Sequence, residues 1–351
     1  MRKRQHSLTV ATEGREIDGW KSVTIESDIL TPADAFTLTR GYDPRVFRLL
    51  RRDTDIEILI DGKPMMRGFV ERRRGDWRGF TISGKDRIGR LVAESAPLHL
   101  DYAGRDLVAV ASELAAPWFE KVKLSNAENR AVMRGRRQRA ASEPLLNPRT
   151  DARQPLPGTK KWEALKELLD RAGYHAWSSA DGRDLILARP DFAQEPSHHF
   201  YVGVDGSNCR SITYDENNAD HYAAIVAMDS GRVGSSYDGL GPDGAGEDFQ
   251  FPKRLLLPVE ADDVAECQRI AERERAARAA RAFVVEIQAW AWGQVVPPAS
   301  GPTLFTHDMV VSACSINTPV DGSYYVVSRS FSLARNEEST RLRCVNLGVQ
   351  L

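Results

Sequence analysis

The chain has 351 residues, 42% of them hydrophobic, and its 48 Lys and Arg residues nearly balance its 49 Asp and Glu residues. This length allows two or three domains with real cores, and the ordinary hydrophobic content argues against wholesale disorder. The net charge of −1 excludes a global attraction to nucleic acid or to an anionic membrane, so either role would need a local patch.

Residues 1–98 are predicted to form a first β domain. Hydrophobic and polar residues alternate in this part, as at Ile56, Ile58 and Ile60, and a period of two indicates strands with one buried face. Asp61-Gly62 separates two apolar runs and is a strong hairpin signal, while residues 74–77 (RGDW) predict a second turn. Several short strands joined by turns indicate a small antiparallel barrel or sandwich.

Residues 99–190 are predicted to form a small α/β domain. A helix is expected within residues 103–119, and a second helix is expected to begin at the N-cap Thr159 and to end at Gly173. Residues 125–158 are polar, basic and rich in proline, which predicts an exposed loop. A hairpin is expected around Asp181-Gly182. The helical spacing places on the apolar faces Leu107, Val110, Ala111 and Leu114 in the first helix, and Trp162, Leu165, Leu168 and Leu169 in the second.

Residues 191–351 are predicted to form a second β domain, which contains a glycine-rich loop over residues 231–250 and a helix over about 262–281. The helix is rich in Arg, Glu and Ala and runs without a turn into the strand-like segment AFVVEIQAW; Ala282 is the expected point of change. Glu274 and Arg278 have the favourable i,i+4 order, and Ala276, Ala279, Ala280 and Phe283 share one face. This pattern favours a structural brace over a phosphate-binding stripe.

The candidate chemical motifs are weak. GLGPDG (residues 239–244) fits the GxGxxG spacing, but Pro242 interrupts it and nearby carboxylates would repel phosphate, so a loop is expected. His198 and His199 would point to opposite faces of a strand, and His221 and His307-Asp308 have no third ligand at a suitable spacing. We therefore expect no catalytic, cofactor-binding or metal-binding residues and no enzymatic activity.

The cysteines and the lack of long apolar segments indicate where the protein is made. Cys209, Cys267, Cys314 and Cys344 form no CxxC pair, which argues against a zinc site or a disulfide scaffold and favours reduced thiols. The basic N-terminus lacks an apolar segment, so no signal peptide is expected, and no apolar run approaches the roughly 20 residues that span a bilayer. Production in a cytoplasm, without direct membrane insertion, is expected.

Three basic clusters raise the alternative of nucleic-acid binding: Arg2 to Arg4, Arg72 to Arg74, and Arg134 to Arg139 within residues 130–139. They lack interleaved aromatic residues and a recognisable binding motif, and acidic residues elsewhere offset them. Solvated loops and ion pairs between subunits are the favoured interpretation.

Several segments in matching order resemble one protein family. EIDGWKSVTIESDILTPADAFTLT (Glu16 to Thr39) resembles the start of Mu-type phage baseplate hub proteins, which are grouped with late control protein D and the head of VgrG spike proteins. DTDIEILIDGKPMMRGFVE, FTISGKDRIGRLVAESA, the helix and hairpin that follow residue 158, and the strands after THDMVV are similar to later parts of the same proteins. Residues 125–157 are longer and more basic than the family pattern, and THDMVV replaces its usual Pro-Gly.

The resemblance implies a β-rich α+β protein with two related antiparallel β-barrel domains and a small α/β domain, assembled as a ring-shaped homotrimer. Two barrels in each of three subunits would join a hexameric tail tube to a trimeric central spike. The expected function is that of a structural hub of a contractile tail, located in the virion baseplate and assembled in the host cytoplasm. It would contact the spike, the tube and other baseplate proteins, with DNA only as passing cargo.

Two other functions stay open at this point: a cell-wall hydrolase of the baseplate, and the head of a type VI secretion spike. A pair of carboxylates or a Cys/His constellation in a cleft would favour the hydrolase. Type VI spike heads normally continue into a spike on the same chain, and the end of this sequence at Leu351 favours a separate spike.

Overall fold

The computed structural model describes residues 6–347, except residues 101, 103, 104, 125–154, 218, 220, 221, 238–252, 260, 262, 296–301, 335 and 336. The chain divides into two compact units. Unit 1 comprises Met1–Asp191, Ala289–Asp308 and Val327–Arg341, and unit 2 comprises Phe192–Gln288, Met309–Val326 and Leu342–Leu351. The predicted division into three domains, with boundaries at residues 98 and 190, differs from this division into two units and stays a prediction.

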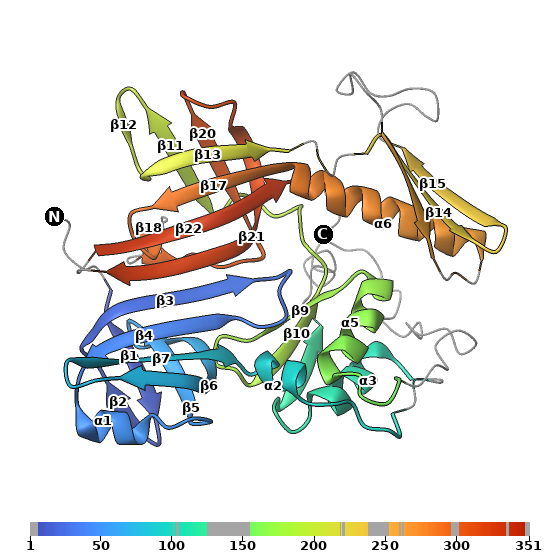
Figure 1. Cartoon of the computed structure of the whole chain (residues 1–351). Helices are drawn as coiled ribbons and strands as arrows, with labels where there is room; N and C mark the ends of the chain where they lie inside the picture. The colour runs from blue at the N-terminus through green and yellow to red at the C-terminus, as the bar shows by residue number, and fades with distance from the viewer. Residues whose placement is uncertain are drawn as a thin grey trace, which may run out of the picture. The chain divides into compact units, whose positions relative to one another are not determined.

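The N-terminal part of unit 1 is a sheet of antiparallel strands. In the order of pairing, β3, β4, β7, β6, β5, β1 and β2 lie side by side (Figure 1). The second half of β21 (Asp321–Ala334) pairs with β3, with Phe331 opposite Ile25. The strands are β1 (Leu8–Thr12), β2 (Arg15–Ile17), β3 (Trp20–Asp28), β4 (Ala35–Gly41), β5 (Asp55–Ile60), β6 (Lys63–Gly75) and β7 (Gly79–Asp86). The β-rich texture predicted for this segment is confirmed.

The local signals in this sheet have clear structural outcomes. Ile56, Ile58 and Ile60 are all buried, as their alternation predicts. Asp61 and Gly62 join β5 to β6 with positive φ angles of 52° and 74°, the left-handed pair that a tight hairpin requires. The second predicted turn overlaps the link between β6 and β7.

Two short helices of unit 1 were not predicted, α1 (Pro44–Leu49) and α2 (Ile88–Ala93). The signal for α1 is visible in the sequence. The Asp43 side chain accepts hydrogen bonds from the backbone N–H groups of Arg45 (2.9 Å) and Val46 (3.3 Å), and Pro44 occupies the first helical position. A six-residue helix is too short for apolar periodicity to show.

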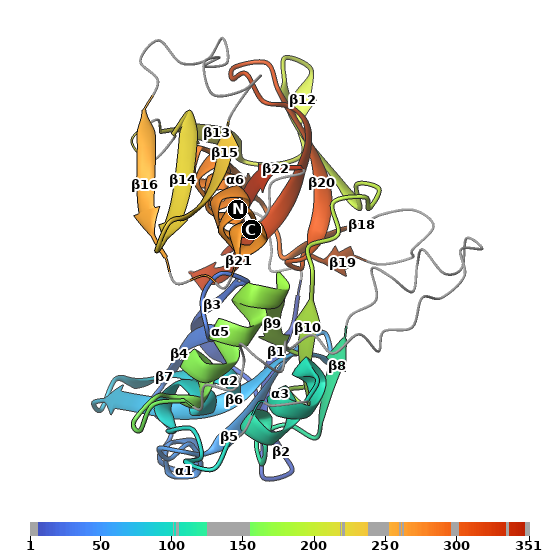
Figure 2. The same cartoon turned by 90° about the vertical axis from the view of Figure 1, so that its right-hand side faces the viewer.

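The rest of unit 1 includes a small α/β layer. The strands β8 (Lys121–Leu124), β10 (Asp184–Ala188) and β9 (His175–Ser178) form a sheet in that order, with β8 parallel to β10. Helices α3 (Leu107–Ala115) and α5 (Lys161–Ala172) lie beside this sheet (Figure 2). The hydrophobic cluster between them contains the predicted apolar faces, and α2 adds Ile88 and Leu91 to it. The short strands β18 (Gly293–Val295) and β19 (Pro302–Leu304) also belong to unit 1.

The predicted N-cap of α5 was wrong by one residue. Lys160, and not Thr159, precedes the helix, and its backbone N–H donates to Glu163 Oε2 at 2.9 Å. A glutamate at the third helical position therefore satisfies the N-terminus, so the hydroxyl of a threonine is not needed. Gly173 ends the helix with φ 69°, as predicted.

Unit 2 contains a second set of paired strands. Its strands include β11 (His198–Gly203), β12 (Gly206–Ser207), β13 (Ser211–Glu216), β17 (Phe283–Ala289), β20 (Met309–Ser315) and part of β22 (Glu337–Asn346). β13 pairs with β17 antiparallel, but β11 pairs with β20 parallel, so the expectation of a wholly antiparallel second domain was wrong. Parallel pairing needs a long connection, which the many residues between β11 and β20 supply.

The predicted loop over residues 231–250 was wrong at its start. Arg232–Tyr237 forms strand β15, which pairs with β14 (Ala224–Asp229); β16 (Arg254–Pro258) lies on the other side of β14. Gly234 is a glycine because β15 packs closely on α6 (Val264–Ala282): a Cβ at Gly234 would collide with the backbone of Cys267 and Gln268. Glycine here serves close packing and not a loop. The segment GLGPDG lies outside the described residues.

The helix α6 lies along β14 and β15 (Figures 1 and 2) and passes directly into β17. It ends at Ala282, the predicted point of change, and Phe283 has extended angles of φ −132° and ψ 112°. The carbonyl oxygen of Ala282 accepts a hydrogen bond of 2.8 Å from Asn217 N–H beyond the end of β13. No turn is needed, because the backbone N–H of Asn217 in the same chain satisfies this carbonyl group at the end of the helix. The Glu274–Arg278 ion pair, at 2.7 Å, is confirmed.

Candidate functional site

The residues singled out from the sequence are not gathered in one place. His198 is buried on β11 with Nδ1 3.0 Å from Ser197 Oγ, while His199 faces the other way and is exposed. His221 and the arginines Arg2 to Arg4 and Arg134 to Arg139 lie outside the described residues. In the described part of the chain, no group of three His, Cys, Asp or Glu residues has the arrangement of a metal site, and no helix is long and apolar enough to span a membrane.

His307 lines a cavity of unit 1 with a volume of about 860 Å³. The cavity is bounded by the β5–β6 hairpin, the β9–β10 hairpin and the segment before β20, and apolar side chains such as Met66 and Trp177 form part of its wall. Four ionisable residues at this cavity form what we call the charge cluster: Asp34, Asp86, His307 and Arg329. Asp86 and Arg329 are buried, whereas Asp34 and His307 are partly buried.

The two carboxylates of the charge cluster are neighbours across two strands. Ala35 on β4 is opposite Lys85 on β7, and Asp86 N–H donates to Asp34 C=O at 2.9 Å, so Asp34 and Asp86 continue the same ladder. Directly opposite residues have Cβ atoms about 4.5–5.5 Å apart. The fold therefore holds two acidic side chains side by side.

Each carboxylate also has a local partner. Ser27 Oγ donates to Asp34 Oδ2 at 2.7 Å, and Ile88 N–H at the start of α2 donates to Asp86 Oδ1 at 3.1 Å. Asp86 Oδ2 is buried and has no hydrogen-bond partner among the described residues. A proton on one of the two carboxyl groups would supply the missing donor.

The pKa values of the pair follow from this environment. Burial raises the pKa of Asp34 to about 6, against the opposing effect of the Ser27 hydrogen bond. Burial, followed by repulsion from Asp34, raises the pKa of Asp86 well above its usual range. Two adjacent acids in a poorly solvated site do not both ionise readily, so the pair retains a proton at mildly acidic pH.

The basic members of the charge cluster respond in the opposite sense. Burial lowers the pKa of Arg329 to about 10, and burial together with the charge of Arg329 lowers the pKa of His307 to about 3. Arg329 Nη1 donates to Phe305 C=O at 2.6 Å, and the His307 ring meets the Trp177 ring edge-on at 5.2 Å. His307 is therefore a neutral packing residue at physiological pH.

The chemistry available to the charge cluster is limited. A glycosidase of the common type needs one carboxylic acid and one carboxylate that flank the substrate. Here both acids sit on one side of the cavity, and Asp86 binds the start of α2 while Asp34 binds Ser27. The arrangement fits a buried polar link between β4, β7 and α2 better than it fits a catalytic pair.

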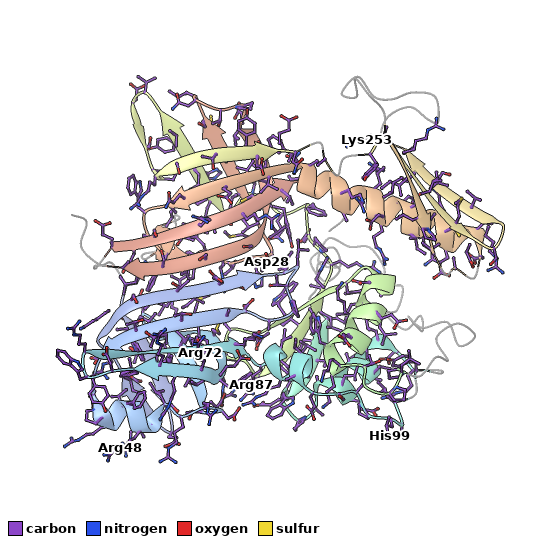
Figure 3. All side chains as sticks on the ribbon, in the orientation of Figure 1. Asp28, Arg48, Arg72, Arg87, His99 and Lys253 are labelled. Atoms are coloured by element: carbon purple, nitrogen blue, oxygen red, sulfur yellow. The ribbon has the colours of Figure 1, made fainter. Side chains whose placement is uncertain are left out.

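A second feature of unit 1 is a groove of about 1000 Å³ lined by arginines, which we call the arginine groove. Arg48 lies on α1 and Arg72 on β6 (Figure 3). Arg73 bridges the two elements, since its Nη1 donates to the carbonyl groups of Phe47 (2.8 Å) and Leu50 (3.2 Å) at the end of α1. The lining residues are Arg48, Arg51, Arg52, Asp53, Glu71, Arg72 and Arg73.

Sequence reasoning found only part of these two sites. It named His307 and Arg72 to Arg74, but it missed Asp34, Asp86, Arg329 and the arginines of α1. The run RLLRR (residues 48–52) was a visible basic signal in the sequence, but only the fold shows that it shares one groove with Arg72 and Arg73. The carboxylates of the charge cluster carried no distinct signal in the sequence.

Comparison with known proteins supports the resemblance found in the sequence. Residues 7–86 match the family described as Mu phage baseplate assembly protein GpP-like, N-terminal. This confirms the resemblance for β1 to β7. No curated protein matches the chain in sequence.

Solved structures share the fold over nearly the whole chain. The tail protein from Neisseria meningitidis MC58 has a TM-score of 0.80 at 23% identity, and 98% of each chain is covered. The 43 kDa tail protein of prophage MuSo2 from Shewanella oneidensis has a TM-score of 0.77 at 16% identity, covering 98% of this chain and 99% of the other. A type VI secretion component of E. coli is more distant, with a TM-score of 0.54 at 9% identity, covering 96% and 76%. The chain therefore has the β-rich fold of Mu-type tail proteins.

Proposed function

We propose that this chain is the structural hub of the baseplate of a contractile phage tail or a phage-like particle. It acts as a homotrimer in which each subunit contributes two related barrel domains. The ring holds a trimeric spike on one side and joins the tail tube on the other. Tape measure and DNA pass through its channel, and the protein resides in the virion after assembly in the host cytoplasm.

The observation that carries this proposal is a baseplate family match combined with a shared fold over the full length. Residues 7–86 match a baseplate assembly family, and the similarity to the Neisseria and Shewanella tail proteins covers nearly all of both chains. A shared fold does not by itself establish function, so the family match in the first sheet gives the proposal its direction.

A baseplate-associated cell-wall hydrolase is the second candidate, because Asp34 and Asp86 form a carboxylate pair at a cavity. This candidate predicts that purified protein clears peptidoglycan and that Asp86→Asn abolishes clearing without unfolding the protein. The hub predicts no clearing by wild type. The pKa values do not separate the two candidates, because Asp34, with a pKa of about 6, is mostly ionised at neutral pH while the raised pKa of Asp86 keeps its proton on. The geometry favours the hub, since Asp34 is bound to Ser27 and Asp86 to the start of α2.

The head of a type VI secretion spike is the third candidate, and the fold similarity to the E. coli component favours it. The similarity to the two tail proteins is closer in TM-score and spans both chains nearly completely. Phage-like tails are therefore the first choice of particle.

The hub is tested by the mass and shape of the purified protein. Light scattering after gel filtration should give about three times the chain mass of 39.1 kDa, and electron microscopy should show a three-fold ring with a central hole. Loss of the gene should yield particles without an assembled baseplate. A monodisperse monomer at high concentration, with no trimer after crosslinking, would refute the hub.

A further inference from the structure

The arginine groove carries positive charge that the chain itself does not neutralise. Arg48, Arg52 and Arg72 are exposed and have no ion pair among the described residues. Arg45 and Arg74, close in sequence to these residues, are exposed and equally unpaired within the described part of the chain. Adjacent guanidinium groups repel one another, and a partner that brings negative charge would relieve this repulsion.

The two acidic residues of the groove are already engaged elsewhere. Asp53 Oδ1 is 2.9 Å from Arg90 Nη1, and Glu71 Oε1 is 3.8 Å from Lys85 Nζ. Both cations lie outside the set of residues that line the groove. The acids that would otherwise offset the arginines are therefore paired with other side chains.

One arginine of the groove is held in place by contacts within the fold. Arg73 fixes the end of α1 against β6 through two backbone carbonyl groups, and its guanidinium carbon lies 4.1 Å from the centre of the Phe47 ring. Tyr42, 47% exposed, contacts Phe47 at 6.1 Å between ring centres. Arginine beside exposed tyrosine is a composition enriched at the energetic centres of protein interfaces.

Unit 2 offers a surface with the opposite charge. β13 pairs only with β17 among the described strands, so it is an edge strand. Asp215 and Glu216 are exposed on β13, and Glu286 is exposed on β17. Glu286 is opposite Thr213, two residues from Asp215, so Asp215 and Glu286 share one face of the strand pair. None of these three carboxylates has an ion pair in the described part of the chain, and we call them the acidic edge.

We propose that the arginine groove of one copy binds the acidic edge of a second copy of the chain. The inference rests on the proposed trimeric hub and names the surfaces that would close its ring. A contact between two different surfaces is heterologous, and repetition of a heterologous contact generates a closed ring when the rotation allows it. The overall net charge of −1 shows that acidic residues elsewhere in the chain offset the arginines of the groove in number.

The acidic edge also has a protective role that agrees with this proposal. Charged residues on an edge strand discourage uncontrolled pairing with other strands. Arginines that meet those charges would select one partner and one register, because like charges in any other arrangement repel. Nucleic acid is the competing occupant, since guanidinium groups bind phosphates equally well.

The test is a charge swap followed by light scattering of the full chain. A groove variant, Arg48→Glu with Arg52→Glu and Arg72→Glu, is compared with an edge variant, Asp215→Lys with Glu216→Lys and Glu286→Lys. A combined variant carries all six changes. A matched control, Arg15→Glu with Lys21→Glu and Lys121→Glu, reverses three exposed cations outside the groove. Circular dichroism and thermal melting establish that every variant is folded.

We expect wild type and control to be trimers. In the groove and edge variants, the protein concentration below which the trimer dissociates should be about 100-fold higher than in wild type. The combined variant should recover the trimer, because its groove is acidic and its edge is basic. A trimeric wild type whose groove variant stays trimeric would overturn this inference and leave the hub intact. Dissociation without recovery in the combined variant would exclude β13 as the occupant, and retention of DNA by wild type but not by the groove variant would assign the groove to phosphate. A monomeric wild type would overturn the hub itself.

Discussion

Replacement of Asp34 by asparagine should make the chain more stable at neutral pH. The pKa of Asp34 is about 6 in the folded protein, against 3.8 for an unperturbed aspartate. A raised pKa means that the folded state binds the proton more tightly than the unfolded state does. The favourable contribution of this group is therefore complete below about pH 4 and is lost as the pH rises through 6.

The size of the effect follows from the shift. At about 1.4 kcal/mol per pKa unit, the ionisation of Asp34 reduces the free energy of unfolding by at most about 3 kcal/mol between pH 4 and pH 7.5. Partial exposure of the side chain lowers this limit. Asparagine is neutral at every pH, can accept the Ser27 hydrogen bond, and can donate its amide N–H to Asp86.

The assay is urea denaturation of wild type and Asp34→Asn at several values between pH 4 and pH 7.5. The two proteins should be similar near pH 4, and the variant should be more stable by about 1–3 kcal/mol at pH 7.5. Asp18→Asn, at an exposed position, is the control for a general change of charge. Parallel pH profiles for wild type and Asp34→Asn would show that burial does not perturb Asp34, and the account of the charge cluster would be wrong.

Three further predictions concern packing and protonation. Gly84→Ala should destabilise unit 1 by about 2–4 kcal/mol, because the new Cβ would collide with a backbone carbonyl group of the adjacent strand. Gly14 has free space around it but a positive φ, so Gly14→Ala should cost only about 1 kcal/mol. Thermal melting of the two variants compares these costs. Leu114→Ala in the fully buried face of α3 should cost about 2–5 kcal/mol in urea unfolding, and Leu156→Ala at an exposed position should cost almost nothing; equal costs would contradict the assigned core. The pKa of His307 is about 3, so its imidazole should stay neutral and its ¹⁵N NMR signals should not change from pH 5 to pH 8. A titration of these signals with a midpoint near pH 6.5 would show that the ring is solvated.

The charge cluster gives the first unit a specific internal link. Asp86 joins the end of β7 to the start of α2, and Arg329 on β21 holds the segment between β19 and β20 through the carbonyl group of Phe305. Removing one buried charged partner usually destabilises a protein more than the intact interaction stabilises it. These residues are therefore expected to fix which strands meet, even though they contribute little net stability.

Features of the fold that depend on residues close in sequence were predicted correctly, with a few exceptions among the short elements. Local chemistry was sufficient for the Asp61-Gly62 turn, for the buried face of α3, for Gly173 at the end of α5 and for the change from helix to strand at Ala282. Each of these depends on a few neighbouring residues whose conformational preferences agree with the fold. The short helices α1 and α2 and the strand β15 were missed because six residues carry too little periodicity, and because Gly234 looked like a loop residue.

The tertiary structure alone decided which strands pair and which side chains meet. Alternating hydrophobicity shows that β21 and β3 each have a buried face, but it does not show that Phe331 lies opposite Ile25, or that β11 runs parallel to β20. The same holds for Asp34, Asp86 and Arg329, whose pKa values depend on burial and on charges brought close by folding. The sequence by itself determined the β-rich elements and the resemblance to baseplate proteins; the charge cluster and the arginine groove exist only in three dimensions, because their members are neighbours in space and not along the chain.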